Sequence, residues 1–286
     1  MESQNFPAQK GNGFIDKLKR VVNQYFGGDE KTSTLIIQSA NDDEPMLPEM
    51  KSAAISIIEK EARRIKTKKQ IVEKASSIKS EDEFVSEEKP GDDWVTRFFN
   101  TVEDITEDSL QNLWAQILAG EVKRPGSFSL RTLDVLRNMT KEDAELYSRT
   151  VGSYCYDGYI LTEAQYGISL EDRIALSEMG LLSPDELTRT ITITQEKQLN
   201  RLNERYALFL TRDTSIPIDV KFECRSLTKA GRELLQLVDK KDCFELFAYV
   251  ADKFKNVGVS SVDLHKIKEW KEDGTVSYYI FPEKRY

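Results

Sequence analysis

The spacing of apolar residues predicts helices through the first half of the chain. The apolar side chains of Phe14–Phe26 fall on one helical face, with Lys17, Lys19 and Arg20 at other positions, which predicts a short amphipathic helix. From Glu49 to about Ile78 the apolar residues recur at intervals of three, four or seven, so we expect one long helix. Six residues carry this pattern: Ala54, Ile58, Ala62, Ile65, Val72 and Ala75.

Breaks between these helices are marked by glycine, proline and clustered charge. The stretch from Gly27 to Pro48 is typical of a mobile linker, with at most a brief strand at residues 35–37. We expect further helices to begin at Asp93 and at Thr106, each residue acting as an N-cap. Gly120 is the expected left-handed stop of the second of these helices.

The densest pattern is LWAQILAGEVKRPGSFSLRTLDVLRNMTKEDAEL, residues 113–146. Its Pro-Gly pair predicts a turn, Ser129 can cap the following helix, and Thr140 with Asp143 resembles a capping box that opens another. Trp114 falls on the apolar face of the first helix, where we expect a core anchor. Most of this motif therefore predicts tightly joined helices rather than chemistry.

Beyond Gly158 the pattern changes to strands. β-Branched and aromatic residues dominate TRTITIT, YALFLT and IDVKFEC, and the last alternates apolar and charged residues like a half-buried strand. SLEDRIALSEMGLL predicts a short helix that starts at Ser169 and stops near Gly180, and SLTKAGRELLQLV predicts another capped by Ser226 or Thr228. Helix, hairpin and Leu-Thr-x-x-Gly helix in this order are seen in winged-helix units.

These elements predict a mostly α protein with a smaller β part, an α+β fold, in four segments. They are an amphipathic helix and mobile linker at 1–48, a helical region at 49–128, a winged-helix-like unit with a β-wing at 129–240, and a small C-terminal α/β cap at 241–286. The cap should hold one helix and a hairpin with an Asp-Gly turn. A chain of 286 residues is long enough for more than one core.

Composition narrows the classes of protein. A hydrophobic fraction of 39% is too high for wholesale disorder, and no run approaches the roughly 20 apolar residues of a membrane span. The first residues lack the order of a secretory signal, so we expect a cytoplasmic protein. One histidine and three cysteines without C-x-x-C spacing argue against a metal site or a disulfide framework, and we expect no cofactor.

Catalytic motifs are scarce. There is no Walker loop and no G-x-G-x-x-G, and we expect His265 to be a lone exposed histidine on a strand. A metal-dependent nuclease needs two carboxylates and a lysine, and Asp185, Asp219 and Lys221 match that string. We interpret them instead as a turn residue and the solvent face of a strand, so no catalytic residue is assigned.

Two groups of polar residues are candidate binding sites. The first group, which we call the polar rim, comprises Glu121, Lys123, Arg124, Ser127, Ser129, Arg131 and Thr132. It could bind a partner or ligand, although helix caps and an Arg131–Glu121 pair could account for most of these residues. The basic patch could bind phosphate or be a solvated face paired with neighbouring acids; it comprises Arg63, Arg64, Lys66, Lys68 and Lys69. The net charge of −8 argues against wholesale coating of nucleic acid.

DDWVTRFF, the string WAxILAGExxxPGSxSxRTL and MTKEDAEL together resemble a bacterial domain family of unknown function, over about Asp92 to Leu146. That family is distantly similar to the abortive-infection alpha proteins, which are linked to defence against phage. The resemblance implies relatives in defence but carries no catalytic residue.

We therefore expect a noncatalytic interaction protein, a sensor or effector in anti-phage defence. It would act through a protein partner and through assembly into a homo-oligomer. The alternative is a regulator that binds nucleic acid through the basic patch, and a metal-dependent nuclease is the third hypothesis. The N-terminal amphipathic helix could dock on the protein's own core, on a second subunit or, less favoured, on an anionic membrane.

Overall fold

A computed structural model describes residues 12–26, 48–78, 85–156, 158–162, 168–202, 205–213, 216–238, 244–257, 259–270, 276–278, 282 and 284–285. The predicted linker and its brief strand, and the Asp-Gly turn of the C-terminal hairpin, lie outside these residues. The fold is mixed α+β, as predicted. The chain forms two compact units, residues 1–141 and 142–286, which are described one at a time.

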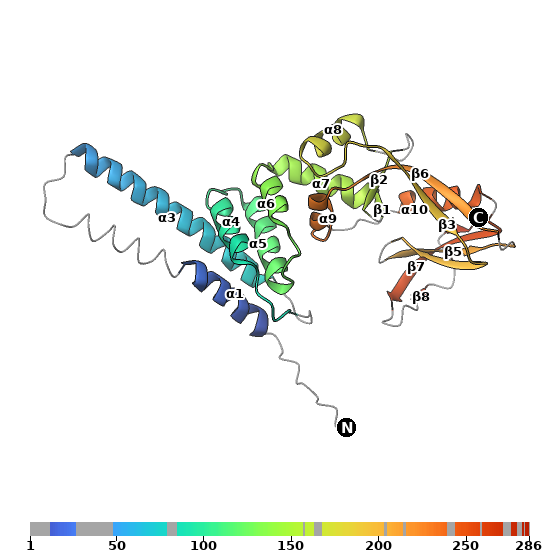
Figure 1. Ribbon diagram of the computed structural model, residues 1–286, viewed down its shortest axis with the longest axis horizontal. Coiled ribbons are helices and arrows are strands. Elements are labelled where there is room, and N and C mark those ends of the chain that lie inside the picture. Colours follow the sequence, from blue (N-terminus) through green and yellow to red (C-terminus); the bar gives the residue numbers. More distant parts are fainter. Residues whose placement is uncertain are drawn as a thin grey trace, which may run out of the picture. The chain divides into compact units, whose positions relative to one another are not determined.

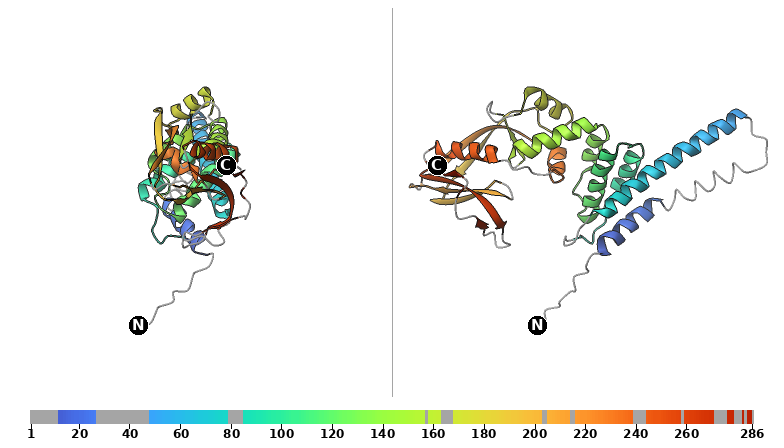
Figure 2. Two further views of the ribbon diagram at one scale, coloured as in Figure 1. Left: turned by 90° about the vertical axis from the view of Figure 1, so that its right-hand side faces the viewer. Right: turned by 180° about the vertical axis from the view of Figure 1, so that it is seen from behind.

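Helices build the first unit (Figure 1). They are α1 (Asn12–Phe26), α3 (Pro48–Ser77), α4 (Asp92–Val102), α5 (Asp108–Lys123) and α6 (Leu130–Arg137). The C-terminal half of α3 lies along α5, and α1 contacts α3, α4 and α5. In both the front and the rear view, the N-terminal half of α3 extends away from the other helices (Figures 1 and 2).

Aromatic rings form the core of this unit. Phe98 stacks on Trp94 at 5.1 Å between ring centroids and meets the edge of Trp114 at 5.5 Å. The Trp94 indole N–H, buried with its ring, donates to the Phe128 carbonyl oxygen at 2.7 Å. Trp114 is 0% exposed, so its prediction as a core anchor is confirmed.

Helix ends in this unit differ from the prediction at three points. Gly91, not Asp93, is the N-cap of α4, and Glu107, not Thr106, is the N-cap of α5. Gly91 has no side chain to cap with, and the Glu107 side chain makes no capping hydrogen bond. Helix α5 continues to Lys123, so Gly120 is not its stop. A Cβ atom at Gly120 would lie 2.8 Å from the Phe128 ring, so the glycine is needed for close packing.

The second unit combines helices with antiparallel sheets (Figure 1). Its helices are α7 (Lys141–Tyr154), which begins at the unit boundary, α8 (Leu170–Glu178), α9 (Lys229–Leu235) and α10 (Phe244–Lys255). One sheet has the order β1 (Cys155–Tyr156), β2 (Tyr159–Leu161), β6 (Ile218–Ser226) and β3 (Leu187–Ile193). The other has the order β4 (Lys197–Arg201), β5 (Tyr206–Thr211), β7 (Ser261–Trp270) and β8 (Val276–Tyr278), with β9 (Lys284–Arg285) also on β7.

Strand β6 confirms the predicted alternation. Val220, Phe222 and Cys224 are buried, and the charged residues between them are exposed. Ser169 accepts from the Asp172 amide at the start of α8, and Thr228 accepts from the Gly231 amide at the start of α9, so both predicted caps are confirmed.

Pairing of β5 with β7 joins segments that the predicted boundary at residue 240 separates. The buried cluster of this unit likewise runs from Leu161 to Leu264 and includes Phe247 and Phe254 of α10. The C-terminal helix and hairpin therefore share a sheet and a core with the preceding segment. The sequence pattern could not indicate this sharing, because it depends on contacts between distant strands.

Candidate functional site

The outer half of α3, Pro48–Lys60, carries an exposed apolar surface. Ile55 is 57% exposed and Ile57 is 62% exposed, whereas Ile71 and Ala75, farther along the same helix, are 0% exposed. Five of the six residues in the run AAISII, residues 53–58, are apolar. Successive helical residues point about 100° apart, so the five apolar residues spread over roughly 200° of the helix circumference, wider than the roughly 100° stripe of an ordinary amphipathic helix. The polar residues Ser52, Ser56, Glu59 and Lys60 occupy the remaining side.

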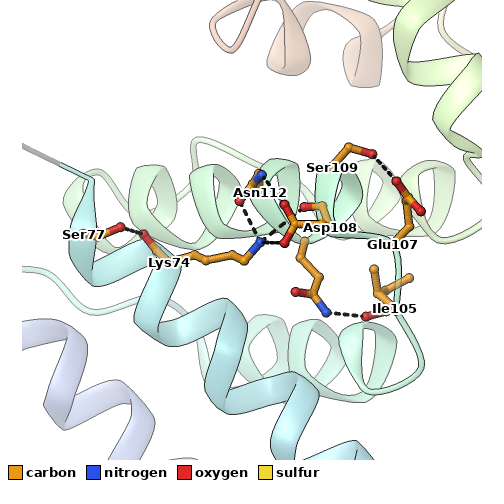
Figure 3. Close-up of polar contacts among 8 residues, drawn as sticks. Lys74, Ser77, Ile105, Glu107, Asp108, Ser109 and Asn112 are labelled. Carbon is orange, nitrogen blue, oxygen red and sulfur yellow. Dashed lines mark hydrogen bonds and ion pairs between the residues drawn. The ribbon is translucent and has the colours of Figure 1, made fainter.

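The inner half of α3 is fastened to the start of α5. Lys74 Nζ contacts the Asp108 carboxylate and donates to Asn112 Oδ1 at 2.9 Å, and Asn112 donates back to Asp108 at 3.2 Å (Figure 3). The hydrogen bond from Lys74, followed by its charge, lowers the pKa of the Asp108 carboxyl group. Because α3 is anchored here, its outer half extends beyond the packed part of the helix.

Residues of the basic patch divide into two groups. Arg64 and Lys68 each contact the Glu103 carboxylate at 3.1 Å, and Arg64 also contacts Asp104 at 3.4 Å. The Lys68 side chain is only 4% exposed. These two side chains therefore tie α3 to the end of α4. Neighbouring acids compensate their charge, as in the interpretation of the basic patch as a paired face rather than a phosphate site.

The remaining patch residues form an exposed row on α3. Arg63, Lys66 and Lys69 are exposed, and Lys60 continues the same spacing of three residues. Within the described ranges none of the four takes part in an ion pair. Residues three apart lie next to one another on a helix surface. We call this row, Lys60, Arg63, Lys66 and Lys69, the basic ridge.

Most of the polar rim has a structural role. The Glu121 carboxylate is 2% exposed and accepts from the Gly126 amide at 2.7 Å and the Phe128 amide at 3.0 Å, which closes the Pro-Gly turn. Thr132 is 0% exposed, with its hydroxyl 3.2 Å from that of Ser129. The predicted pairing of Glu121 with Arg131 is therefore wrong, because the carboxylate binds backbone amides instead.

Two further members of the rim also make structural contacts within the first unit. Ser127 donates to the Arg124 carbonyl oxygen at 2.6 Å, and Lys123 Nζ lies 5.5 Å from the centroid of the Phe14 ring. The side chains of Arg124 and Arg131 are exposed. The rim joins α5 to α6 and α1, and these two arginines are its outward-facing cations.

Helix α1 packs on its own unit. Phe14, Leu18 and Val21 are buried, which matches the predicted apolar face and the option of docking on the protein's own core. Lys17 donates to the Ser86 carbonyl oxygen at 2.8 Å, and burial lowers the pKa of its ammonium group against the opposing charges of nearby glutamates. Among the described helices none is long and apolar enough to cross a membrane.

The residues of the nuclease hypothesis do not come together. Asp219 lies opposite Thr192 in the β3–β6 ladder and accepts from its hydroxyl at 2.7 Å. Asp185 lies two residues before Leu187, which is at the other end of that ladder. At about 3.3 Å per residue the two carboxylates are roughly 20 Å apart, too far to share a cation. Within the described residues no group of three His, Cys, Asp or Glu side chains could hold a metal.

His265 is buried rather than exposed. It is 5% exposed, and its ring lies 5.0 Å from that of Phe209 and 4.7 Å from that of Tyr278. The prediction of an exposed histidine is wrong because aromatic neighbours on β5 and β8 cover this face of β7.

Ile55 and Ile57 were missed by the periodic pattern. The pattern selects one face of a helix, and these residues lie on two different faces. Their signal is the density of apolar residues in AAISII, which exceeds what one buried face requires.

These features define an α+β protein whose most unusual surface is an exposed apolar helix end beside a basic ridge. A family model described as "Protein of unknown function (DUF2806)" matches residues 56–159 and 157–251, and the chain belongs to this family. No curated protein and no solved structure matched the chain.

Proposed function

We propose that this protein is a noncatalytic interaction protein that self-associates through the outer half of α3. The observation that carries the proposal is the exposure of Ile55 and Ile57 on a helix end whose apolar surface is wider than one helical face. Burial of an isoleucine side chain stabilises by about 1.5–3 kcal/mol relative to leaving it in water. A second copy offers the same surface, so a two-fold contact would bury these residues from both chains.

The test is the mass of the full chain in solution. Light scattering after gel filtration, over a range of protein concentrations, should give a dimer or larger assembly for the natural chain. The double variant Ile55→Ser with Ile57→Ser should be monomeric with an unchanged unfolding midpoint, because both side chains are exposed. Ile216→Ser, at a residue 71% exposed in the second unit, is the matched control and should keep the assembly.

A natural chain that stays monomeric at every concentration would contradict self-association. Monomeric mass together with capture of another protein that depends on Ile55 and Ile57 would assign the same surface to a different partner. Only the second outcome would keep the exposed helix end as an interacting element, with a different occupant.

Nucleic-acid binding is the second candidate, and the basic ridge supports it. Four exposed cations at a spacing of three residues can follow a line of phosphates, and each phosphate contact on duplex DNA adds about −0.9 to the slope of log affinity against log salt. Lys66→Glu with Lys69→Glu should abolish such binding. Arg137→Glu with Lys141→Glu makes the same change of charge at exposed residues elsewhere and is the control.

The link to anti-phage defence rests on the resemblance to the abortive-infection alpha proteins. It extends the proposal to an effector whose assembly is needed for protection. Phage plating efficiency on cells with the natural chain, compared with cells carrying the Ile55→Ser and Ile57→Ser variant, tests this extension. Equal plating on the two strains and on cells without the protein would reject it.

The winged-helix-like assignment of residues 129–240 is likewise a proposal, supported by the order of α8, the β3–β6 ladder and α9.

A further inference from the structure

Two arginines of the second unit converge on one carboxylate. Arg173 on α8 and Arg225 on β6 contact the same oxygen of Glu186, Oε1, at 3.2 Å and 3.5 Å. Glu186 directly precedes β3, in which Leu187 lies opposite Cys224, so Glu186 and Arg225 are neighbours across the ladder. Segments distant in the sequence thus bring two guanidinium groups to one point.

Both arginines are mostly withdrawn from water. The side chain of Arg173 is 19% exposed and that of Arg225 is 17% exposed, whereas Glu186 is 53% exposed. The Nε atoms of both arginines and the Ser177 hydroxyl are buried without a hydrogen-bond partner among the described residues. Ser177 follows Arg173 by one helical turn, so the two side chains lie on the same side of α8.

The charges at this point do not balance. Each guanidinium group has five N–H donors and a permanent positive charge, and within the described residues the pair shares one carboxylate oxygen. Asp172, next to Arg173 in sequence, instead contacts Arg149 at 3.4 Å. An uncompensated cation and unpaired donors in a mostly buried position are costly, and an added oxyanion would relieve both.

We propose that Arg173, Ser177 and Arg225 form a binding site for the phosphate group of a small molecule, with Glu186 as its cover. Guanidinium groups match the oxygen spacing of a phosphate and bind it through paired N–H donors. The half-exposed Glu186 side chain rotates outward, and the phosphate takes its place between the arginines. The Ser177 hydroxyl then donates to a phosphate oxygen.

The surroundings favour a small phosphate ester over a nucleic acid. The outward face of α8 carries exposed Glu171 and Glu178, together with Leu170, 56% exposed, and Ile174, 48% exposed. Acidic and apolar side chains repel or fail to bind a chain of phosphodiesters. The two arginines are also too buried to reach along a backbone, but they can enclose one terminal phosphate.

Titration calorimetry of the full chain with inorganic phosphate, at constant ionic strength maintained with chloride, tests the site. The natural chain should bind one phosphate. Arg173→Gln and Arg225→Gln should each weaken binding at least tenfold. Arg149→Gln, which removes the exposed arginine paired with Asp172, is the control and should leave the affinity unchanged.

Glu186→Gln separates a binding site from a purely structural ion-pair cluster. It removes the competing carboxylate, so phosphate should bind more tightly than to the natural chain. If the arginines only hold Glu186 in place, Glu186→Gln lowers the unfolding midpoint without a gain in affinity, which overturns the proposal.

Ser177→Ala keeps both charges and serves if an arginine variant fails to fold; it should weaken binding by several fold. Absence of phosphate binding to both the natural chain and Glu186→Gln would refute the site. Binding of duplex DNA that depends on Arg173, without binding of inorganic phosphate, would refute it equally. These measurements do not depend on the mass of the assembly, so the site stands or falls separately from self-association.

Discussion

Glu121 and Glu186 show how differently two carboxylates of one chain are held. Glu121 is buried and accepts two backbone amides of a turn. Glu186 is half exposed and contacts two arginines through one oxygen. The first is fixed by the chain that folds around it, whereas the second can leave its partners without breaking a backbone contact. We therefore expect Glu121 to matter for stability and Glu186 for binding.

Glu121→Gln should destabilise the protein by about 2 kcal/mol, because hydrogen bonds to charged groups contribute about 1.5–3 kcal/mol. The amide can still accept from one backbone N–H, but its NH₂ group would face the other. Urea unfolding measures the change. Glu145→Gln, at an exposed residue of α7, should change the free energy of unfolding by less than about 0.5 kcal/mol. Equal effects of the two substitutions would contradict the assignment.

The buried hydroxyl of Tyr147 should make the protein less stable at alkaline pH. Its hydroxyl, buried on α7, donates to the Gly231 carbonyl oxygen at 2.5 Å, and burial raises its pKa above the ordinary value of 10.0. Above pH 10 the unfolded chain releases this proton while the folded chain keeps it, so stability falls as pH rises. The difference in unfolding free energy between the natural chain and Tyr147→Phe should be constant below pH 9. It should shrink by up to about 1.4 kcal/mol per pH unit above pH 10.

Helices and strands with a clear period were predictable, and those that depend on distant contacts were not. The long helix and the alternation of β6 follow from spacing alone. β4 has the sequence KQLNR, which is polar and has no strand period, and it forms because β5 lies beside it. Gly120 looked like a helix stop because a glycine that lets a ring approach has the same sequence signal as one that ends a helix.

Two helical glycines should respond differently to alanine. A Cβ atom at Gly231 on α9 would lie 2.3 Å from the Leu181 carbonyl oxygen, which is backbone and cannot move aside. Gly231→Ala should therefore cost about 3 kcal/mol or more. At Gly120 the obstacle is the edge of the buried Phe128 ring, which can shift more readily than backbone, and the gain of about 1 kcal/mol in helix propensity offsets part of the cost, so the loss should be smaller. Chemical denaturation of both variants checks the order, and a larger loss for Gly120→Ala would contradict it.

The candidate sites were harder to predict than the fold, because their contacts join helices and strands that are far apart in the sequence. The basic patch was identified from its run of cations, but only contacts with Glu103 on another helix show which two are compensated. Arg173 and Arg225 stand 52 positions apart in the numbering, and nothing local to either indicates that they share Glu186.

The division into two compact units predicts two unfolding transitions. Ile117 is 0% exposed in the first unit and Leu208 is 0% exposed in the second, and truncation of such side chains to alanine costs about 2–5 kcal/mol. In scanning calorimetry Ile117→Ala should lower one transition and Leu208→Ala the other. A single transition that moves equally in both variants would show that the units unfold together.

The projecting end of α3 has a consequence for its own folding. Isolated helices shorter than about 12–15 residues are marginal in water, and Pro48–Lys60 has little tertiary support, with its described side chains almost all exposed. In a lone chain this end should fray, and contact with another copy would fix it. If the proposed self-association occurs through this end, helix formation and assembly form one coupled equilibrium, and dilution would loosen the helix as well as separate the chains.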